Sequence, residues 1–120
     1  MIGTGSIPHT PDWLEGTRLD GVFTVPKDKV YLDEMQERLE GCRKVVTIGA
    51  GFIGVELSDE LVKAGHEVTL VEKLPSILRL AFDQDVAEQA QTLLAGRGVE
   101  IITGRGVARI LGDERVNGVE

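Results

Sequence analysis

Apolar positions along the chain repeat with spacings that predict helices and strands in alternation. Over residues 29–40, Leu32, Met35 and Leu39 recur at intervals of three and four residues, which predicts an amphipathic helix. Residues 44–48 form a short run rich in β-branched apolar side chains, which is typical of a buried parallel strand.

A second helix and a second strand follow directly. Ile53, Leu57 and Leu61 lie on one face of a helix predicted from residue 53 to residue 64. The apolar run over 67–72 predicts the next strand. Strand, turn, helix and strand together form a βαβ unit, whose crossover is expected to be right-handed.

The rest of the pattern predicts one more helix, one more strand and a hairpin. Asp85 with Glu88 three residues later matches a capping box at the start of a helix. Its core-facing stripe is predicted to consist of Val86, Ala90, Leu93 and Leu94. Residues 99–103 predict a third strand, and the alternation over 107–116 predicts a β-hairpin.

Residues 1–28 break this periodic pattern. They contain Pro8, Pro11 and Pro26 together with several glycines, which predicts an irregular lead-in. We therefore divide the chain into a lead-in, 1–28, and a domain, 29–120. The order of elements in the domain predicts the α/β class, as a Rossmann-like three-layer nucleotide-binding domain with a parallel sheet and an added β-hairpin or meander.

Composition narrows the classes of partner. The 120 residues suit one domain with its own core, and a net charge of -7 argues against nucleic-acid binding because phosphate backbones would be repelled. The single cysteine, Cys42, can form neither an internal disulfide nor a thiolate metal site. The sequence contains neither a signal peptide nor an apolar run long enough to cross a membrane, so we expect a cytoplasmic protein without a membrane partner.

The candidate chemistry lies in the turn Gly49-Ala50-Gly51-Phe52-Ile53-Gly54, which follows a predicted strand and opens a predicted helix. Gly49 permits the sharp turn, Gly51 lacks the Cβ that would block a pyrophosphate, and Gly54 allows close packing of helix and strand. The free N–H groups at the helix start would then bind the pyrophosphate.

Glu72 ends the second predicted strand and completes this dinucleotide fingerprint. A carboxylate there accepts hydrogen bonds from both hydroxyls of the adenosine ribose and repels a 2′-phosphate, so NAD(H) is favoured over NADP(H). Lys73 could soften that preference, although side chains alternate along a strand and Lys73 should point elsewhere.

Other interpretations remain open at this point. The glycines could serve packing alone, and FAD or S-adenosylmethionine could occupy the same turn. His9 and His66 have no ligand partner at a metal-binding spacing, so we interpret both as surface residues. We find no Ser/His/Asp or Cys/His arrangement, and we identify neither a catalytic residue nor a metal ligand.

The stretches Val45–Glu56 and Gly65–Glu72 resemble the NAD(H)-binding domain of the FAD-dependent pyridine-nucleotide–disulfide oxidoreductases, a family that includes dihydrolipoamide dehydrogenase, NADH oxidase and coenzyme A-disulfide reductase. Ile2–Pro8 is similar to the A-T-G-S-x-P segment with which that family leaves its FAD domain. The resemblance covers nearly the whole chain.

The resemblance implies a role for each matching position. Gly49, Gly51 and Gly54, with the backbone of Phe52 and Ile53, would hold the pyrophosphate, and Glu72 would bind the ribose. Glu56 would face the nicotinamide end, and the backbone near Val107 would pass the adenine. Phe52 would cover the nicotinamide pocket, or else it is a core residue at the helix start.

The family also implies an activity for the parent protein. NADH passes hydride to FAD, and electrons continue to a disulfide, dioxygen, peroxide or a small redox protein. The FAD domain, its redox cysteines and the dimerisation domain would lie outside this chain, and Cys42 does not match those cysteines. The chain alone is therefore expected to bind NADH without catalysis.

Two rival functions fit the glycine turn. A regulatory NAD-sensing domain would need neither the lead-in nor the hairpin, and a two-domain dehydrogenase would continue with further β–α units.

The chain is expected to stop before the last strand of the family's NAD domain, and the exposed sheet edge would then be covered by another copy of the chain.

Overall fold

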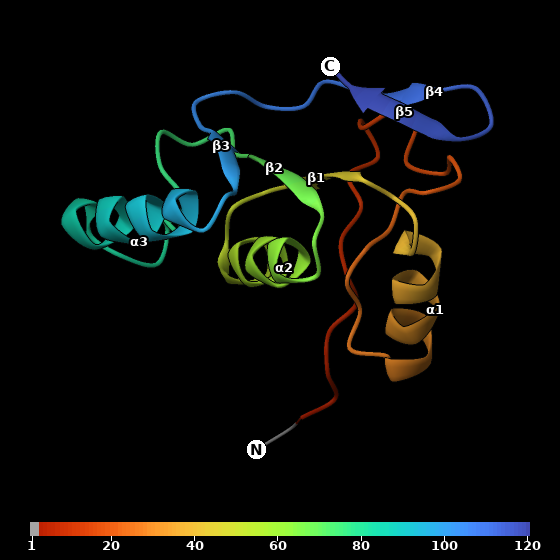
Figure 1. The fold of residues 1–120 in the computed structure, drawn as a ribbon, viewed down its shortest axis with the longest axis horizontal. Helices are drawn as coiled ribbons and strands as arrows, with labels where there is room; N and C mark the ends of the chain where they lie inside the picture. Colours follow the sequence, from red (N-terminus) through yellow and green to blue (C-terminus); the bar gives the residue numbers. More distant parts are fainter. Residues whose placement is uncertain (1–2) are drawn as a thin grey trace. The chain divides into compact units, whose positions relative to one another are not determined.

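A computed structural model describes residues 3–120, so Ile2 of the lead-in motif lies outside the described residues. The chain forms two compact units, which are traced in Figure 1. One unit is Cys42–Val107, and the other joins the chain up to Gly41 with Ala108–Glu120.

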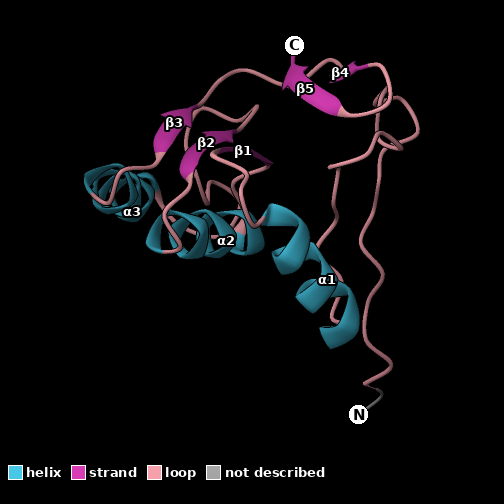
Figure 2. Cartoon of the chain, turned by 45° about the vertical axis from the view of Figure 1, so that its right-hand side comes forward, coloured by secondary structure: helices cyan, strands magenta, loops and turns pink. Residues whose placement is uncertain are grey.

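The unit Cys42–Val107 is a parallel α/β arrangement. Its elements are β1 (Lys44–Ile48), α2 (Phe52–Lys63), β2 (Glu67–Val71), α3 (Gln84–Gly96) and β3 (Glu100–Ile102). The strands pair in the order β1-β2-β3, all parallel, and both helices lie on the same side of this sheet (Figures 1 and 2). The predicted βαβ unit and parallel sheet are confirmed.

Strand register divides the side chains between the two faces of the sheet. Thr47 pairs with Leu70, and both are buried on the face toward α2. Val46 and Ile48 point to the other face and stay 40% and 45% exposed. The core of this unit therefore lies between the sheet and the helices.

Helix α3 differs from its prediction in its start and in its buried face. It begins at Gln84 with Asp83 as its N-cap, so the capping box at Asp85 is wrong. Leu94 is buried as predicted, and Ala87 is buried as well, whereas the predicted core residues Val86 and Leu93 are exposed. The start of the helix thus buries Ala87 in place of its neighbour Val86, because apolar spacing alone cannot choose between adjacent apolar residues.

Helix α2 also has an exposed start. Ile53 was predicted to face the core, but its side chain is 59% exposed, so that prediction is wrong. Leu61 is buried as predicted. Ser58 is fully buried on the same helix, where its hydroxyl donates to the carbonyl oxygen of Gly54 at 2.7 Å. A small polar residue with an internal partner thus replaces one predicted apolar contact.

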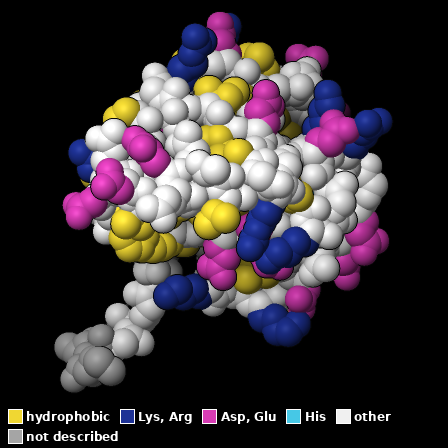
Figure 3. All heavy atoms as spheres, turned by 60° about the vertical axis from the view of Figure 1, so that its left-hand side comes forward, with side chains coloured by type: hydrophobic (Ala, Val, Ile, Leu, Met, Phe, Trp, Pro, Cys, Tyr) yellow, Lys and Arg dark blue, Asp and Glu magenta, His cyan; other side chains and the backbone are white. Residues whose placement is uncertain are grey.

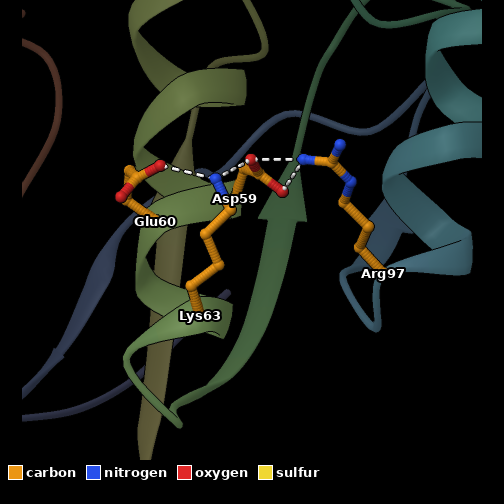
Figure 4. Close-up of polar contacts among 4 residues, drawn as sticks. All are labelled: Asp59, Glu60, Lys63 and Arg97. Carbon is orange, nitrogen blue, oxygen red and sulfur yellow. Dashed lines mark hydrogen bonds and ion pairs between the residues drawn. The ribbon is translucent and has the colours of Figure 1, made fainter.

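An ion network joins α2 to the end of α3 (Figure 4). Arg97 Nη1 contacts both carboxylate oxygens of Asp59, at 2.7 and 2.6 Å. Lys63 Nζ lies 2.8 Å from Asp59 and 2.7 Å from Glu60. The hydrogen bond from Arg97, followed by that from Lys63, lowers the pKa of Asp59 below its ordinary value.

The other unit contains one helix and one hairpin. Its elements are α1 (Lys29–Leu39), β4 (Ile110–Gly112) and β5 (Val116–Val119). The carboxylate of Asp28 accepts from the first amides of α1, as an N-cap does. The antiparallel β4–β5 pair confirms the predicted hairpin, with its strands further along the chain than predicted.

Part of the lead-in pairs with the hairpin. The amide of Ile110 donates to the carbonyl oxygen of Glu15 at 2.9 Å, and the amide of Val116 donates to that of Asp20 at 2.9 Å. These isolated bridges give the segment around residues 15–20 a fixed place beside β4 and β5. The lead-in is irregular, as predicted, but its second half is ordered by main-chain pairing.

Charge is dispersed over the surface shown in Figure 3, where acidic and basic side chains alternate with apolar ones. None of the helices in residues 3–120 has both the length and the apolar character needed to span a membrane.

Candidate functional site

The site predicted from sequence lies at the carboxyl ends of the parallel strands, which form one edge of the sheet. The turn after β1, the segment after β2 and the segment after β3 all start from this edge. Main-chain bonds hold the latter two together: the amide of Gly104 donates to Leu74 O at 2.8 Å, and that of Arg105 donates to Glu72 O at 3.2 Å. The fold thus gathers the glycine turn, Glu72, Lys73 and the chain leading to Val107.

Each glycine of the turn meets a different physical requirement. Gly49 has φ +94°, a conformation that other residues rarely adopt. A Cβ on Gly54 would lie 1.9 Å from the carbonyl oxygen of Gly49, so only glycine permits this approach of helix and turn. A Cβ on Gly51 would meet no atom within 4 Å. Gly51 therefore leaves open space beside the helix start, which is what a bound group would need.

The amino end of α2 is suited to an anion. The first N–H groups of a helix have no intrahelical acceptor, and the N-cap here is Gly51, which has no side chain to accept from them. The aligned peptide dipoles add a partial positive charge at the same place. The twelve-residue helix, from Phe52 to Lys63, is long enough to present this charge.

Glu72 is held by two main-chain hydrogen bonds. Its Oε2 accepts from the amide of Ala50 at 2.6 Å, and its Oε1 accepts from the amide of Leu74 at 2.9 Å. Each carboxylate oxygen has a second lone pair, so both remain able to accept from a ligand hydroxyl. Glu72 thus joins the glycine turn to the segment after β2 and fixes a negative charge there. The sequence predicted the negative charge of Glu72 but not its hydrogen bonds to the amides of Ala50 and Leu74.

Ala50 is held from its other side as well. Its carbonyl oxygen accepts from the amide of Leu78 at 2.8 Å. Leu78 and the preceding Ile77 are buried, and Ala50 itself is only 1% exposed. Both main-chain polar groups of Ala50 are therefore bonded to the loop after β2. Nothing in the local sequence indicates this, because the partners are far apart along the chain.

Phe52 lies at the surface, against a partner that the sequence did not suggest. Its ring contacts that of Phe82 edge-on, with centroids 5.6 Å apart and planes at 79°. The two side chains are 61% and 40% exposed, so the alternative in which Phe52 is a core residue is wrong. Together with the exposed Ile53 they form an apolar surface at the start of α2. Glu56, one turn further along the helix, is also exposed.

Lys73 follows Glu72 directly, and Val107 lies on the segment after β3. Lys73 is exposed, and its Cβ is 3.6 Å from where a Cβ would stand on Gly106. Val107 is only 6% exposed, so its side chain belongs to the core. The side chain of Val107 is therefore not available to a ligand, and the adenine contact expected for the backbone there stays a prediction.

His66, one of the two histidines predicted to lie at the surface, has a contact with the main chain. His66 Nδ1 lies 2.7 Å from the carbonyl oxygen of Cys42, and its ring is half-buried. His66 is therefore a partly exposed residue with one main-chain partner. Both residues precede a strand, so this contact is at the opposite end of the sheet from the glycine turn. Residues 3–120 bring no three His, Cys, Asp or Glu side chains together in a way that could hold a metal ion.

Known proteins resemble this chain over its whole length. The family model described as pyridine nucleotide-disulphide oxidoreductase matches residues 1–120. An NADH oxidase of Methanocaldococcus jannaschii is 35% identical over 99% of this chain and 27% of its own length. The structure of an NAD-dependent persulfide reductase from A. fulgidus superimposes with a TM-score of 0.87 and 32% identity, covering 96% of this chain and 21% of that one.

A further solved structure is that of a water-forming NADH oxidase from Lactobacillus brevis, bound to NADH. It superimposes with a TM-score of 0.80 and 25% identity, covering 96% of this chain and 27% of that chain. This chain therefore spans about a quarter of the length of the proteins that it matches.

Proposed function

Because the chain belongs to the pyridine nucleotide-disulphide oxidoreductase family, we propose that it is the NAD(H)-binding domain of a flavoprotein oxidoreductase. In the parent protein, NADH would reduce FAD, and electrons would continue to a disulfide, oxygen, peroxide or redox-protein acceptor. Residues 1–28 would lead in from the FAD domain, and residues 29–120 would form the nucleotide-binding domain.

The open space at Gly51 carries this proposal. It lies at the amino end of a helix, where N–H groups favour an anion, and a pyrophosphate is the anion that a βαβ unit of this kind binds. Gly49 and Gly54 hold the turn in the shape that leaves this space. The residues therefore fit the group that the family implies.

Glu72 supports NADH as the nucleotide. Its carboxylate is already oriented by Ala50 and Leu74, so accepting hydrogen bonds from ribose hydroxyls requires no reordering. A 2′-phosphate at the same place would bring like charges together, which disfavours NADPH. Lys73 is adjacent and exposed, and it would offset part of that repulsion.

The chain's residues would bind and orient the nucleotide, while the nicotinamide itself supplies the hydride. The exposed Phe52, held edge-on by Phe82, would cover the nicotinamide end, and Glu56 on the same helix would face it. Without the FAD domain of the parent chain, the domain would bind NADH and catalyse nothing.

Calorimetric titration of the chain with NADH and with NADPH tests the proposal. We expect NADH to bind more tightly. Gly51→Ala should abolish binding while leaving the fold intact, because its added Cβ meets no protein atom and fills only the space for the ligand. Gly96→Ala, also in open space but at the end of α3, is the matched control and should bind as the wild type does.

Glu72→Gln tests whether the charge of Glu72 causes the preference for NADH over NADPH. Loss of the charge should narrow the difference in affinity between NADH and NADPH. If neither nucleotide binds the wild-type chain, or if Gly51→Ala binds NADH normally, the proposed site is wrong.

The edge of the sheet at β1 suggests self-association. Within residues 3–120, β1 pairs only with β2, and its apolar Val46 and Ile48 are exposed. An unpaired strand edge is a template for another strand, so we propose that a second copy of the chain pairs there. Sedimentation at high concentration tests this, and a strictly monomeric profile would contradict it.

A further inference from the structure

Leu78 has an unusual backbone conformation. Among residues 3–120 it is the one residue other than glycine with a positive φ, at 53°. The left-handed region is unfavourable for L-residues because the Cβ approaches the neighbouring carbonyl oxygen. A leucine stays there only when its surroundings hold it, and such residues concentrate near functional sites.

The surroundings of Leu78 are well defined. Its side chain is 8% exposed, and the adjacent Ile77 is fully buried, so the segment is anchored in the core. The carbonyl oxygen of Leu78 accepts from the amides of Ala81 and Phe82, at 2.9 and 3.1 Å. With both its side chain and its carbonyl held, the left-handed φ directs its N–H toward Ala50, whose carbonyl oxygen lies 2.8 Å away.

Ala50 is the residue between the first two glycines of the turn. Its carbonyl is held by Leu78, and its N–H is held by the carboxylate of Glu72 at 2.6 Å. The two peptide groups that flank Ala50, Gly49–Ala50 and Ala50–Gly51, thus take their orientation from the loop after β2. Gly49 and Gly51 are conformationally free by themselves, so the turn needs such external ties to keep one shape.

We propose that Leu78 is a positioning residue for the dinucleotide turn. Its left-handed backbone holds the carbonyl of Ala50, and with Glu72 it keeps the turn and the start of α2 in the nucleotide-binding shape before the ligand arrives. The inference rests on the proposed function. A turn that is preformed in only a fraction of molecules binds with an affinity reduced by that fraction, so a loosened turn weakens NADH binding.

Two truncations separate this role from ordinary core packing. Leu78→Ala and Leu78→Gly both remove the buried side chain, but only glycine adopts φ near 53° without strain. Positioning predicts that Leu78→Ala raises the Kd for NADH on the order of tenfold, the factor that the strain of the left-handed conformation represents, and that Leu78→Gly recovers most of this loss. Packing alone predicts equal affinities, or weaker binding by the more flexible glycine variant.

Amide hydrogen exchange without nucleotide gives a second reading. The amide at position 78 donates to Ala50, so it should exchange slowly in the wild type and in Leu78→Gly and faster in Leu78→Ala. Both variants lose core contacts and could be partly unfolded. In that case the measurements are repeated with trimethylamine N-oxide, which favours the folded state, so that folded variants are compared.

The outcomes are distinguishable. If the wild type binds NADH but the two variants bind it equally, or if the glycine variant binds it more weakly, this inference is overturned while the proposed function stands. If the wild type fails to bind NADH, the proposed function is overturned, and Leu78 positions no nucleotide site.

Discussion

Of the buried apolar side chains in residues 3–120, all but Met35 and Ile110 belong to the unit Cys42–Val107. That unit is stabilised by side chains packed between a parallel sheet and two helices. The other unit depends more on its main chain, through pairing of the lead-in with the β4–β5 hairpin. The two units should therefore respond to different kinds of substitution.

Glycines have different structural roles in the two units. In the parallel unit, Gly54 brings a helix against the turn that would bind a nucleotide, and Gly51 leaves open space at the start of that helix. In the other unit, Gly16 has φ +83°, and a Cβ there would lie 2.3 Å from the carbonyl oxygen of Ile110. The same residue type therefore shapes the proposed binding turn in one unit and permits chain pairing in the other.

The largest effect is expected for Gly54→Ala. Its Cβ would lie 1.9 Å from a backbone oxygen that cannot move without moving the turn, so we expect a loss of about 2 to 3 kcal/mol in unfolding free energy together with weaker NADH binding. Gly96→Ala is the matched control, because it also lies in a helix but in open space, and it should stabilise the chain by about 0.5 kcal/mol. Urea unfolding followed by circular dichroism measures both. Changes of the same sign would contradict the close approach of helix and turn.

A smaller and more local effect is expected for Gly16→Ala. Strain and the contact with Ile110 should cost about 1 to 2 kcal/mol, confined to the pairing of the lead-in with the hairpin. Hydrogen exchange should accelerate at the amides of Ile110 and Val116 and stay unchanged at Gly49, whose amide donates to Val71.

Gly5→Ala is the control for Gly16→Ala. Gly5 has nearly the same φ, +82°, but a Cβ there would meet no atom within 4 Å. It should leave the exchange of the hairpin amides unchanged. If Gly16→Ala accelerated exchange equally in both units, the division between them would be wrong.

Sequence reasoning was most successful in the parallel unit because each element there carries its own signal. The β-branched run ended by Gly49 identified β1 at its observed bounds, and Gly65 marked the end of α2. It failed where neighbouring positions compete, as at Val86 and Ala87, because apolar spacing does not say which residue faces a sheet. In the lead-in it predicted irregularity but not pairing with residues about a hundred positions later.

The candidate site shows the same limit. The fingerprint identified Gly49, Gly51, Gly54 and Glu72, since each carries a local steric or charge requirement. The positioning role of Leu78 could not be predicted from the sequence, because leucine has no preference for a left-handed backbone and its partner is Ala50, on another segment. The sequence thus indicates which atoms would touch a ligand, whereas the contacts that hold those atoms in place arise only from the fold.

The smallest effect is expected from the ion network between α2 and α3, since its cations Arg97 and Lys63 are more than half exposed, and ion pairs with solvated partners contribute little beside a packed core. Asp59→Asn removes the carboxylate that Arg97 and Lys63 share. Glu60→Gln is the matched control, because Glu60 contacts only Lys63 within this network. We expect Asp59→Asn to be the less stable of the two variants at neutral pH, and to unfold more easily than the wild type.

The dependence on pH distinguishes this interaction from a packing effect. Contact with Arg97, and then with Lys63, lowers the pKa of Asp59 from its ordinary value of 3.8, so the folded chain binds fewer protons than the unfolded chain in that range. The stabilisation is therefore complete above the ordinary value and is lost as pH falls through the lower, folded-state pKa. The gap in unfolding free energy between wild type and Asp59→Asn should stay constant from neutral pH down to about pH 5 and close toward pH 2. Added salt should narrow it at neutral pH, since most of Arg97 and Lys63 is solvated. A gap of equal size at pH 2 and pH 7 would mean that Asp59 stabilises the fold through packing and not through its charge.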